Sequence, residues 1–244
     1  MDRIELNLKG ETSEKISKII LVEGESDLAF LSLYLCRRYG YEYYHDIDLH
    51  EIDKNMHSSV YSNGNDCFAI FTSGGVTKMN SAFGNIKERI FTKDTKYFVV
   101  IIDSDNKTKE KIISDLKFDG LELKANEFTE YQNDDFDIID FKTYVDVVPK
   151  NRSGALETVI LDSIRNDEKE IVDVSCDFVE KLTTEQKKHI KKARIQLKAK
   201  TGVVFNLLNP DHTFSELQKK FMLIDMNSPV LTESFAFFDK IFIS

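Results

Sequence analysis

Three carboxylates stand where the patterning of the chain indicates the ends of buried strands. Glu23 follows the apolar run 19–22, and Asp103 and Asp105 follow the apolar run 97–102. Ligands bind at the carboxyl ends of the strands in an open parallel sheet, so we expect these side chains at one edge. Asp103 and Asp105 are two residues apart, and in extended backbone such residues point to the same side. Because three carboxylates repel one another, a divalent cation is the natural counter-charge, and oxygen ligands favour Mg²⁺ or Mn²⁺.

Each of these residues also has a simpler explanation when it is taken alone. An Asp at a strand end is commonly a turn former or a helix cap, and Glu23 before a glycine fits an ion pair at the edge of a sheet. Carboxylates after two separate buried strands nevertheless favour a metal site. The glycines at the same predicted edge would let a phosphate approach the backbone, and a nearby lysine is a candidate to stabilise its charge. These residues are Gly24, Gly74, Gly75 and Lys78.

The elements that must position these residues follow from hydrophobic periodicity. Short apolar runs alternate with segments of helical spacing, which predicts an α/β fold with a parallel sheet and right-handed crossovers. The expected strands are 19–23, 67–73, 97–102 and 144–148, and the expected helices between and after them are 27–38, 78–90, 109–116 and 156–165.

Two polar segments and the C-terminal third fit this alternation less well. Segment 43–65 holds three of the five histidines and is predicted to be a loop-rich insertion with one short strand and surface histidines. Segment 122–140 is acidic and is predicted to form a hairpin or an edge strand. Helices are expected over 168–181, 185–200, 213–224 and 233–242. The predicted organisation is therefore an α/β domain over 1–166 with a helical region, 167–244, packed on it.

The composition is that of a folded protein with an acidic surface. Among the 244 residues, 33 Lys and Arg stand against 42 Asp and Glu, and the net charge of −9 argues against a polyanionic substrate. No run approaches the ~18 apolar residues of a membrane span, and residues 1–10 lack the apolar core of a signal peptide. Three scattered cysteines in no metal spacing fit thiols that are kept reduced. We therefore expect a cytoplasmic protein with no membrane partner.

One segment carries the opposite charge. Residues 181–200 contain eight Lys and Arg and one Glu, which makes their net charge +7 and leaves −16 for the rest of the chain. On a continuous helix, four of these residues form one stripe that could hold the phosphates of a nucleic acid, namely Lys187, Lys191, Arg194 and Lys198. Lys192 is a second candidate for the cation at the reacting phosphate. A run of this kind is also typical of a solvated surface helix.

Two motifs stand out: Val-Glu-Gly-Glu-Ser-Asp at 22–27, before a predicted helix, and Asp-Ser-Asp at 103–105, after a predicted buried strand. Together they resemble the TOPRIM domain, which topoisomerases, DnaG-type primases and the nucleases related to OLD (overcoming lysogenization defect) proteins share. The likeness covers about residues 16–165. Together with Pro149, Gly-Ala-Leu-Glu at 154–157 and the ending 221–242, the pattern is similar to small stand-alone TOPRIM-related proteins of bacteria and archaea.

This resemblance implies a fold, a reaction and roles for particular residues. The fold would be a TOPRIM-like Rossmannoid parallel sheet flanked by helices. Glu23 would act as a general acid or base and as a metal ligand, Asp103 and Asp105 would bind metal, and Asp27 and Glu157 would complete the acidic set. Two Mg²⁺ or Mn²⁺ ions held by four or five such ligands can activate a water and stabilise the leaving oxygen of a phosphodiester in DNA or RNA.

The rest of the chain narrows the choice among TOPRIM activities. Its length leaves no room for the further domain of a topoisomerase, and it has neither the zinc spacing of a primase nor a Gly-x-x-x-x-Gly-Lys-Ser/Thr loop. The resemblance therefore implies a nuclease that works with a separate ATPase, as effectors of bacterial defence systems do. The alternative is a non-hydrolytic TOPRIM-like module that binds a nucleotide or a partner protein and keeps the acids for structure.

Overall fold

The structure is a computed structural model that describes residues 16–47, 53–54, 56–64, 66–131, 140–211 and 220–243. Most of the helix predicted over 213–224 lies outside these residues. The described chain divides into two compact units. The first comprises the residues up to Ile102, Lys107–Val147 and the residues from Ile241 onward, and the second comprises Asp103–Asn106 and Val148–Lys240. The division differs from the boundary expected at residue 166, because the end of one central strand and the first helix after the sheet belong to the second unit.

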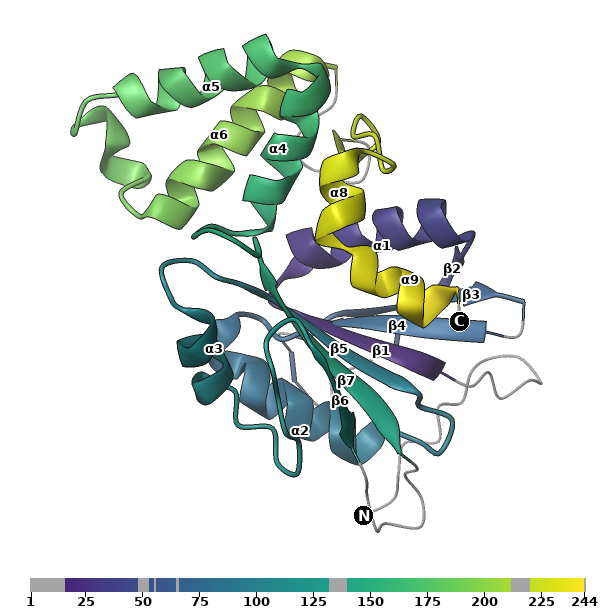
Figure 1. The fold of residues 1–244 in the computed structure, drawn as a ribbon. Coiled ribbons are helices and arrows are strands. Elements are labelled where there is room, and N and C mark those ends of the chain that lie inside the picture. The colour runs from purple at the N-terminus through teal and green to yellow at the C-terminus, as the bar shows by residue number, and fades with distance from the viewer. Residues whose placement is uncertain are drawn as a thin grey trace. The chain divides into compact units, whose positions relative to one another are not determined.

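The first unit is built on a seven-stranded mixed sheet (Figure 1). Its centre is parallel, since β1 pairs in parallel with both β4 and β5. The two sides are antiparallel, because β3 pairs antiparallel with β2 and β4, and β6 pairs antiparallel with β7. In order across the sheet the strands are β2 (Glu42–His45), β3 (Ser58–Asn63), β4 (Asp66–Thr72), β1 (Ile16–Val22), β5 (Tyr97–Asp103), β7 (Phe141–Val148) and β6 (Phe128–Tyr131).

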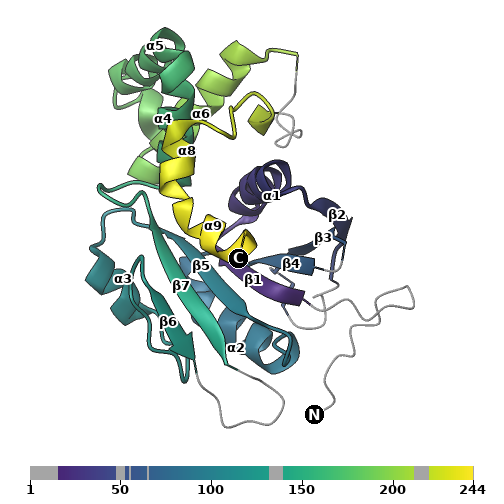
Figure 2. The same cartoon turned by 45° about the vertical axis from the view of Figure 1, so that its right-hand side comes forward.

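Helices cover both faces of this sheet (Figures 1 and 2). On one face lie α2 (Met79–Arg89), which the short 3₁₀ helix η1 (Val76–Lys78) precedes, and α3 (Lys109–Asp115); α1 (Glu25–Tyr39) lies on the other face. Residues of β1 alternate between the faces, as the period of a strand requires. Ile19 and Leu21 join the core beneath α2, which includes Phe83 and Phe98. Burial of the strands on both faces explains why 19–22 and 97–102 are continuously apolar.

The sheet is only partly parallel because β3 pairs antiparallel with its neighbours on one side and β6 pairs antiparallel with β7 on the other. The polar insertion forms two strands where one was expected. β2 and β3 make an antiparallel ribbon that extends the sheet beyond β4. All residues of β2 except His45 are exposed, and an edge strand of this kind carries no apolar run for sequence patterning to detect. The expected edge strand within 122–140 is present as β6.

The second unit consists of helices. α4 (Leu156–Asp167) packs against α5 (Lys169–Lys181), α6 (Ala193–Leu208) and α8 (Pro229–Ser234), as Figure 2 shows. The Ser163 and Ser228 hydroxyls, 2.7 Å apart, join α4 to the start of α8. The 3₁₀ helix η3 (Ala236–Phe238) and α9 (Asp239–Phe242) follow α8 along the chain. Within the part of the chain that the structure describes, no helix is both long enough and apolar enough to span a membrane.

The basic segment does not form one helix. α5 ends at Lys181, the 3₁₀ helix η2 covers Gln186–His189, and α6 begins only at Ala193, after Lys192 in extended backbone. The prediction of one helix over 185–200 was therefore wrong. Without that helix, Lys187 and Lys191 do not share a stripe with the basic residues of α6.

Candidate functional site

Backbone hydrogen bonds join the end of β5 to the segment that leads into α4. The Ser104 amide donates to the Val148 carbonyl at 2.8 Å. Asp105 and Gly154 exchange two bonds, with Asp105 N–H to Gly154 O at 2.7 Å and Gly154 N–H to Asp105 O at 3.1 Å. The Ser104 hydroxyl adds a bond to the Gly154 carbonyl at 3.1 Å. These bonds fix the Asp-Ser-Asp motif against the N-terminus of α4 within the second unit.

The two backbone hydrogen bonds between Asp105 and Gly154 form a β-bridge, which fixes the backbone conformation of Asp105. Its φ of 46° lies in the left-handed region, so Asp105 does not continue the extended backbone of β5. The extended backbone from which Asp103 and Asp105 were expected to share a side is therefore absent at Asp105. Opposite it, Gly154 has a φ of 154°, and a Cβ there would overlap Thr158 Oγ1. A glycine is needed for the bridge to form.

Asp103 caps helix α4. It is the last residue of β5 and is buried, and its Oδ1 accepts a hydrogen bond from Leu156 N–H at 2.9 Å. The N-cap residue itself is Ala155, which has no side-chain oxygen, so the capping carboxylate comes from Asp103, more than fifty residues earlier in the chain. A negative charge at a helix N-terminus is stabilised by the helix dipole and by the free amides of the first turn.

Two basic side chains of α6 contact the acids of this region. Arg194 Nη2 lies 3.2 Å from Asp103 Oδ2, and Lys198 Nζ lies 3.4 Å from Glu157 Oε1. Arg194 and Lys198 are four residues apart and so share one face of α6. Glu157 stands in the first turn of α4, and its Oε2 is buried without a hydrogen-bond partner among the described residues. Two acids and two bases therefore form one charged cluster in the second unit.

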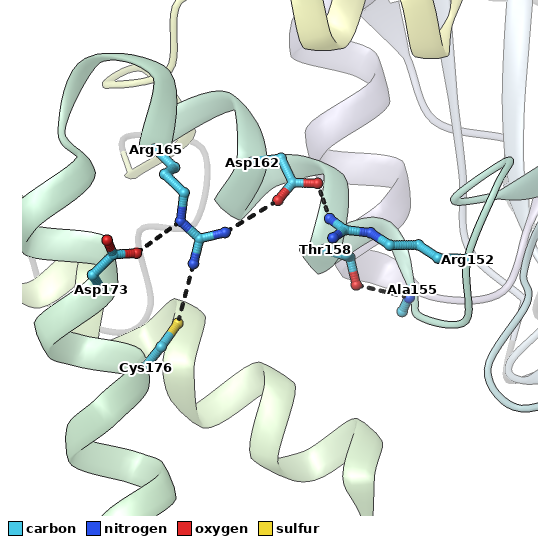
Figure 3. Close-up of polar contacts among 7 residues, drawn as sticks. All are labelled: Arg152, Ala155, Thr158, Asp162, Arg165, Asp173 and Cys176. Atoms are coloured by element: carbon cyan, nitrogen blue, oxygen red, sulfur yellow. Dashed lines mark hydrogen bonds and ion pairs between the residues drawn. The ribbon is translucent and has the colours of Figure 1, made fainter.

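A second charged network secures the loop before α4 (Figure 3). Arg152 pairs with Asp162, whose other oxygen lies 3.4 Å from Arg165, and Arg165 donates to Asp173 of α5 at 3.0 Å. Arg165 also donates to the Cys176 sulfur at 4.0 Å. The network ties the loop that carries Gly154 to α4, and α4 to α5. Sequence reasoning missed it because Arg152 and Asp162 belong to no motif.

In the first unit, the Glu-Gly motif forms the turn from β1 into α1. The buried Glu23 follows β1, and its carbonyl accepts a hydrogen bond from Gly75 N–H at 2.9 Å. Gly24 is the N-cap of α1, and its amide donates to Asp27 Oδ2 at 2.9 Å. The observed bond gives Asp27 a capping role. The turn after β4 contains Gly74 at φ 73° and Gly75 at φ 118°, and such backbone favours glycine.

His57 also lies at this edge of the sheet, although its position was predicted only as surface loop. Thr72, at the end of β4, exchanges hydrogen bonds with His57: Thr72 N–H reaches His57 O at 2.8 Å, and His57 N–H reaches Thr72 Oγ1 at 2.9 Å. The ring nitrogen Nε2 lies 3.1 Å from Glu25 Oε1 at the start of α1. No signal in the sequence could have found this pair, because it depends on the pairing of β3 with β4.

The predicted site residues thus fall into two groups, each described within its own unit. The second unit brings together Asp103, Glu157, Arg194 and Lys198 and holds Asp105 by its backbone, whereas the first unit holds Glu23, Gly24, Asp27, Gly74, Gly75 and Lys78. Lys187 donates to the Glu180 carbonyl at 2.7 Å, and Lys191 and Lys192 are exposed.

The donors of the second unit suit a divalent ion in their chemistry. All are carboxylate oxygens, and the buried Glu157 Oε2 lacks a hydrogen-bond partner in the described part of the chain. Asp103 and Glu157 face Arg194 and Lys198, however, and the described residues include no group of three or more His, Cys, Asp or Glu side chains placed to hold a metal ion. In this structure, Arg194 and Lys198 contact the carboxylates that a metal ion would need as ligands.

Comparisons with known proteins identify a family. No curated protein matches the chain. The crystal structure of a hypothetical protein, PH0156 from Pyrococcus horikoshii OT3, is similar to it with a TM-score of 0.42 and 16% identity, over 93% of this chain and 99% of that chain. The model of DUF3226, a family described as a protein of unknown function, matches residues 17–243. The chain therefore belongs to the DUF3226 family.

Proposed function

We propose that this protein is a phosphodiesterase that cleaves DNA or RNA with the help of Mg²⁺ or Mn²⁺, and that its fold is of the TOPRIM type. The observation that carries the proposal is the cluster at the start of α4, where two largely buried carboxylates, Asp103 and Glu157, face two bases one helical turn apart. Enzymes that transfer phosphoryl groups use carboxylates to bind metal ions and cationic side chains to bind phosphate.

The topology of the sheet supports the same reaction. Glu23 follows β1 and Asp103 ends β5, and these two strands are parallel neighbours in the centre of the sheet. Carboxyl ends of parallel strands are where ligands bind in such folds. β4, whose end is followed by Gly74 and Gly75, is the other parallel neighbour of β1.

Each residue has a defined task under this proposal. Asp103, Asp105 and Glu157 would hold the metal, with Glu23 and Asp27 as the remaining acids. The metal would supply an activated water and neutralise charge on the phosphate. Glu23 would move a proton to or from the reacting oxygens, and Arg194 and Lys198 would contact substrate phosphates. Because the sequence has no ATP-binding loop, we propose a separate ATPase as a partner, as in a bacterial defence system.

Cleavage of nucleic acid by the full-length protein tests the proposal. We expect plasmid, single-stranded DNA or RNA to be cut in Mn²⁺ or Mg²⁺, alone or with an ATPase encoded nearby, and to stay intact in EDTA. Glu23→Gln should slow cleavage about 100-fold, the scale on which acid–base groups contribute. Asp103→Asn should also slow cleavage, because it removes the charge of a proposed metal ligand. Asn keeps an oxygen that can accept the Leu156 bond, so helix α4 stays capped in the second variant.

Glu88→Gln is the matched control for these variants. Glu88 is an exposed acid of α2 outside the Glu-Gly motif and the cluster, so its loss should leave the rate unchanged. The proposal fails if the wild type cuts no DNA or RNA under any of these conditions. It also fails if Glu23→Gln cuts as fast as the wild type.

A regulatory module without hydrolysis is the second candidate, and one observation favours it. Asp103 already has a structural partner in the amide of Leu156, and Asp27 has one in the amide of Gly24, so both acids contribute to the fold without any metal. Calorimetry separates the candidates. Nucleotide or partner binding that survives Asp103→Asn in a protein without nuclease activity would support the module.

A further inference from the structure

Exposure divides the charged cluster at the start of α4 into a fixed half and a movable half. The side chains of Asp103 and Glu157 are 4% and 12% exposed, whereas those of Arg194 and Lys198 are 31% and 41% exposed. The acids are also tied to their backbone positions, Asp103 by the bond to Leu156 and Glu157 by its place in the first turn of α4. The bases reach in from α6 on long flexible side chains. Movement in this cluster is therefore expected from Arg194 and Lys198.

The contacts between the two halves are of a kind that a cation can replace. Arg194 Nη2 lies 3.2 Å from Asp103 Oδ2, and Lys198 Nζ lies 3.4 Å from Glu157 Oε1. Both distances exceed the roughly 2.7–2.9 Å of a strong charge-assisted hydrogen bond. Glu157 Oε2 is buried with no hydrogen-bond partner among the described residues, so the Lys198 contact leaves half of this carboxylate unsatisfied. A divalent ion would neutralise both acids and could bind this oxygen.

We infer that Arg194 and Lys198 are exchangeable counter-ions: they neutralise Asp103 and Glu157 when no metal is bound, and a divalent cation displaces them. The inference rests on the proposed function for the identity of the metal ligands. The exchange would prevent the acids from repelling one another in the metal-free protein. It would also release two basic side chains at the moment when a metal is in place, so that metal binding and phosphate binding are coupled. By linkage, phosphate would then tighten metal binding by the same factor as metal tightens phosphate binding.

Metal affinity in the absence of nucleic acid tests the exchange. Titration calorimetry with Mn²⁺ would compare the wild type, Arg194→Gln and Lys198→Met. Since each variant removes a competitor of the metal, we expect each to bind Mn²⁺ roughly fivefold more tightly, which is the scale of one partly exposed ion pair. Two controls should match the wild type. Arg194→Lys keeps a cation at the position, and Lys188→Met removes an exposed lysine that pairs with Glu185 in η2 and its flank.

The reactivity of Lys198 gives a second measurement on the unmodified chain. An amine-acylating reagent followed by peptide mass spectrometry reports how exposed each lysine is. We expect Mn²⁺ to raise the labelling rate of Lys198 several-fold and to leave that of Lys188 unchanged. If Mn²⁺ raised the labelling rate of both lysines, or of neither, the result would contradict a release of Lys198 alone.

The outcomes also distinguish this inference from the proposed function. Unchanged or weaker Mn²⁺ binding in Arg194→Gln and Lys198→Met, with wild-type binding intact, overturns the exchange and leaves the nuclease proposal standing. Weaker binding together with a lower melting temperature would show that the two bases are structural ties. If the variants bind Mn²⁺ more tightly but the wild type never cuts nucleic acid, the exchange holds and the proposed reaction fails. If no form binds Mn²⁺, both fail.

Discussion

At the scale of single residues, several acids have a structural task beside the chemistry proposed for them. Asp103 caps α4 through the Leu156 amide, and Asp27 accepts a hydrogen bond from the N-cap of α1. Substitution of a residue with two roles is hard to interpret, because it changes both the stability of the protein and the rate of the reaction. Substitution by an amide separates the roles, because it removes the charge and keeps an acceptor oxygen. The glycines at these turns have no side chain that could take part in a reaction, so their roles depend on backbone geometry alone.

Gly154→Ala should destabilise the protein by about 2 kcal/mol, because alanine is strained at a φ of 154° and its Cβ would overlap Thr158. Gly202→Ala is the matched control. Gly202 lies within α6, and a Cβ there would meet nothing within 4 Å, so alanine should stabilise the helix by about 0.5–1 kcal/mol. Urea unfolding of both variants measures the difference. Equal effects of the two substitutions would contradict the proposed strain at the bridge.

At the scale of elements, a partly buried charge network joins the beginnings of two central strands. Lys18 of β1 pairs with Asp66 at the start of β4, and Asp66 also accepts hydrogen bonds from Ser17 and Tyr41. Burial opposes ionisation of Asp66, but the bonds from Lys18, Ser17 and Tyr41 outweigh it, and the pKa of Asp66 is lowered below 3.8. Burial, and then the hydrogen bond to Asp66, raise the pKa of Tyr41. The network therefore adds stability to the sheet only when Asp66 is ionised.

This network predicts the pH dependence of stability. Because the pKa of Asp66 is lower in the folded protein, its contribution is complete above pH 3.8 and is lost as the pH falls through the folded value. Asp66→Asn should therefore be less stable than the wild type at pH 6, and the difference should shrink toward pH 3. Asp119→Asn, at a fully exposed side chain, should differ little from the wild type at any pH. Urea unfolding between pH 3 and 6 measures this, and a constant deficit in Asp66→Asn would contradict it.

At the scale of the whole molecule, the net charge of −9 hides an uneven distribution. The segment 181–200 carries +7, yet the structure divides its basic residues among different partners. Arg194 and Lys198 contact acids, Lys187 contacts a backbone carbonyl, Lys200 pairs with Glu180, and Lys191 and Lys192 are exposed. Much of the apparent positive surface is thus neutralised internally. Nucleic acid should gain little from the segment until a metal occupies the acids.

Binding of a fluorescent oligonucleotide measures this consequence. We expect weak binding in EDTA, and binding at least tenfold tighter in Mn²⁺, because the metal neutralises the acids and frees cations for phosphate. Asp103→Asn should reduce the effect of Mn²⁺, whereas Glu88→Gln should not. Anisotropy titrations at two salt concentrations provide the measurement. Tight binding in EDTA that Mn²⁺ does not improve would show that the basic segment acts independently of the acids.

Local patterning predicted the elements of the sheet core and the ends of the strands from which site residues project. Runs that are apolar on both faces identify β1, β4 and β5, and helical spacing identifies α1, α2 and α4, because burial imposes these periods on the sequence. The polar insertion was expected to contain one strand, and the exposed edge strand β2 beside β3 was missed because an exposed strand carries little apolar signal. The basic segment was read as one helix because side-chain type alone does not reveal a break in the backbone at Lys192.

The sequence by itself determined which side chains are available: acids after two central strands, glycines at the turns, and a basic segment near the end. Only the tertiary structure decided their partners. The bridge between Asp105 and Gly154, the cap that Asp103 gives α4, and the ion pairs of Arg194 and Lys198 all join residues roughly 40 to 90 positions apart. Contacts over such separations depend on how the elements pack, and no local period encodes them.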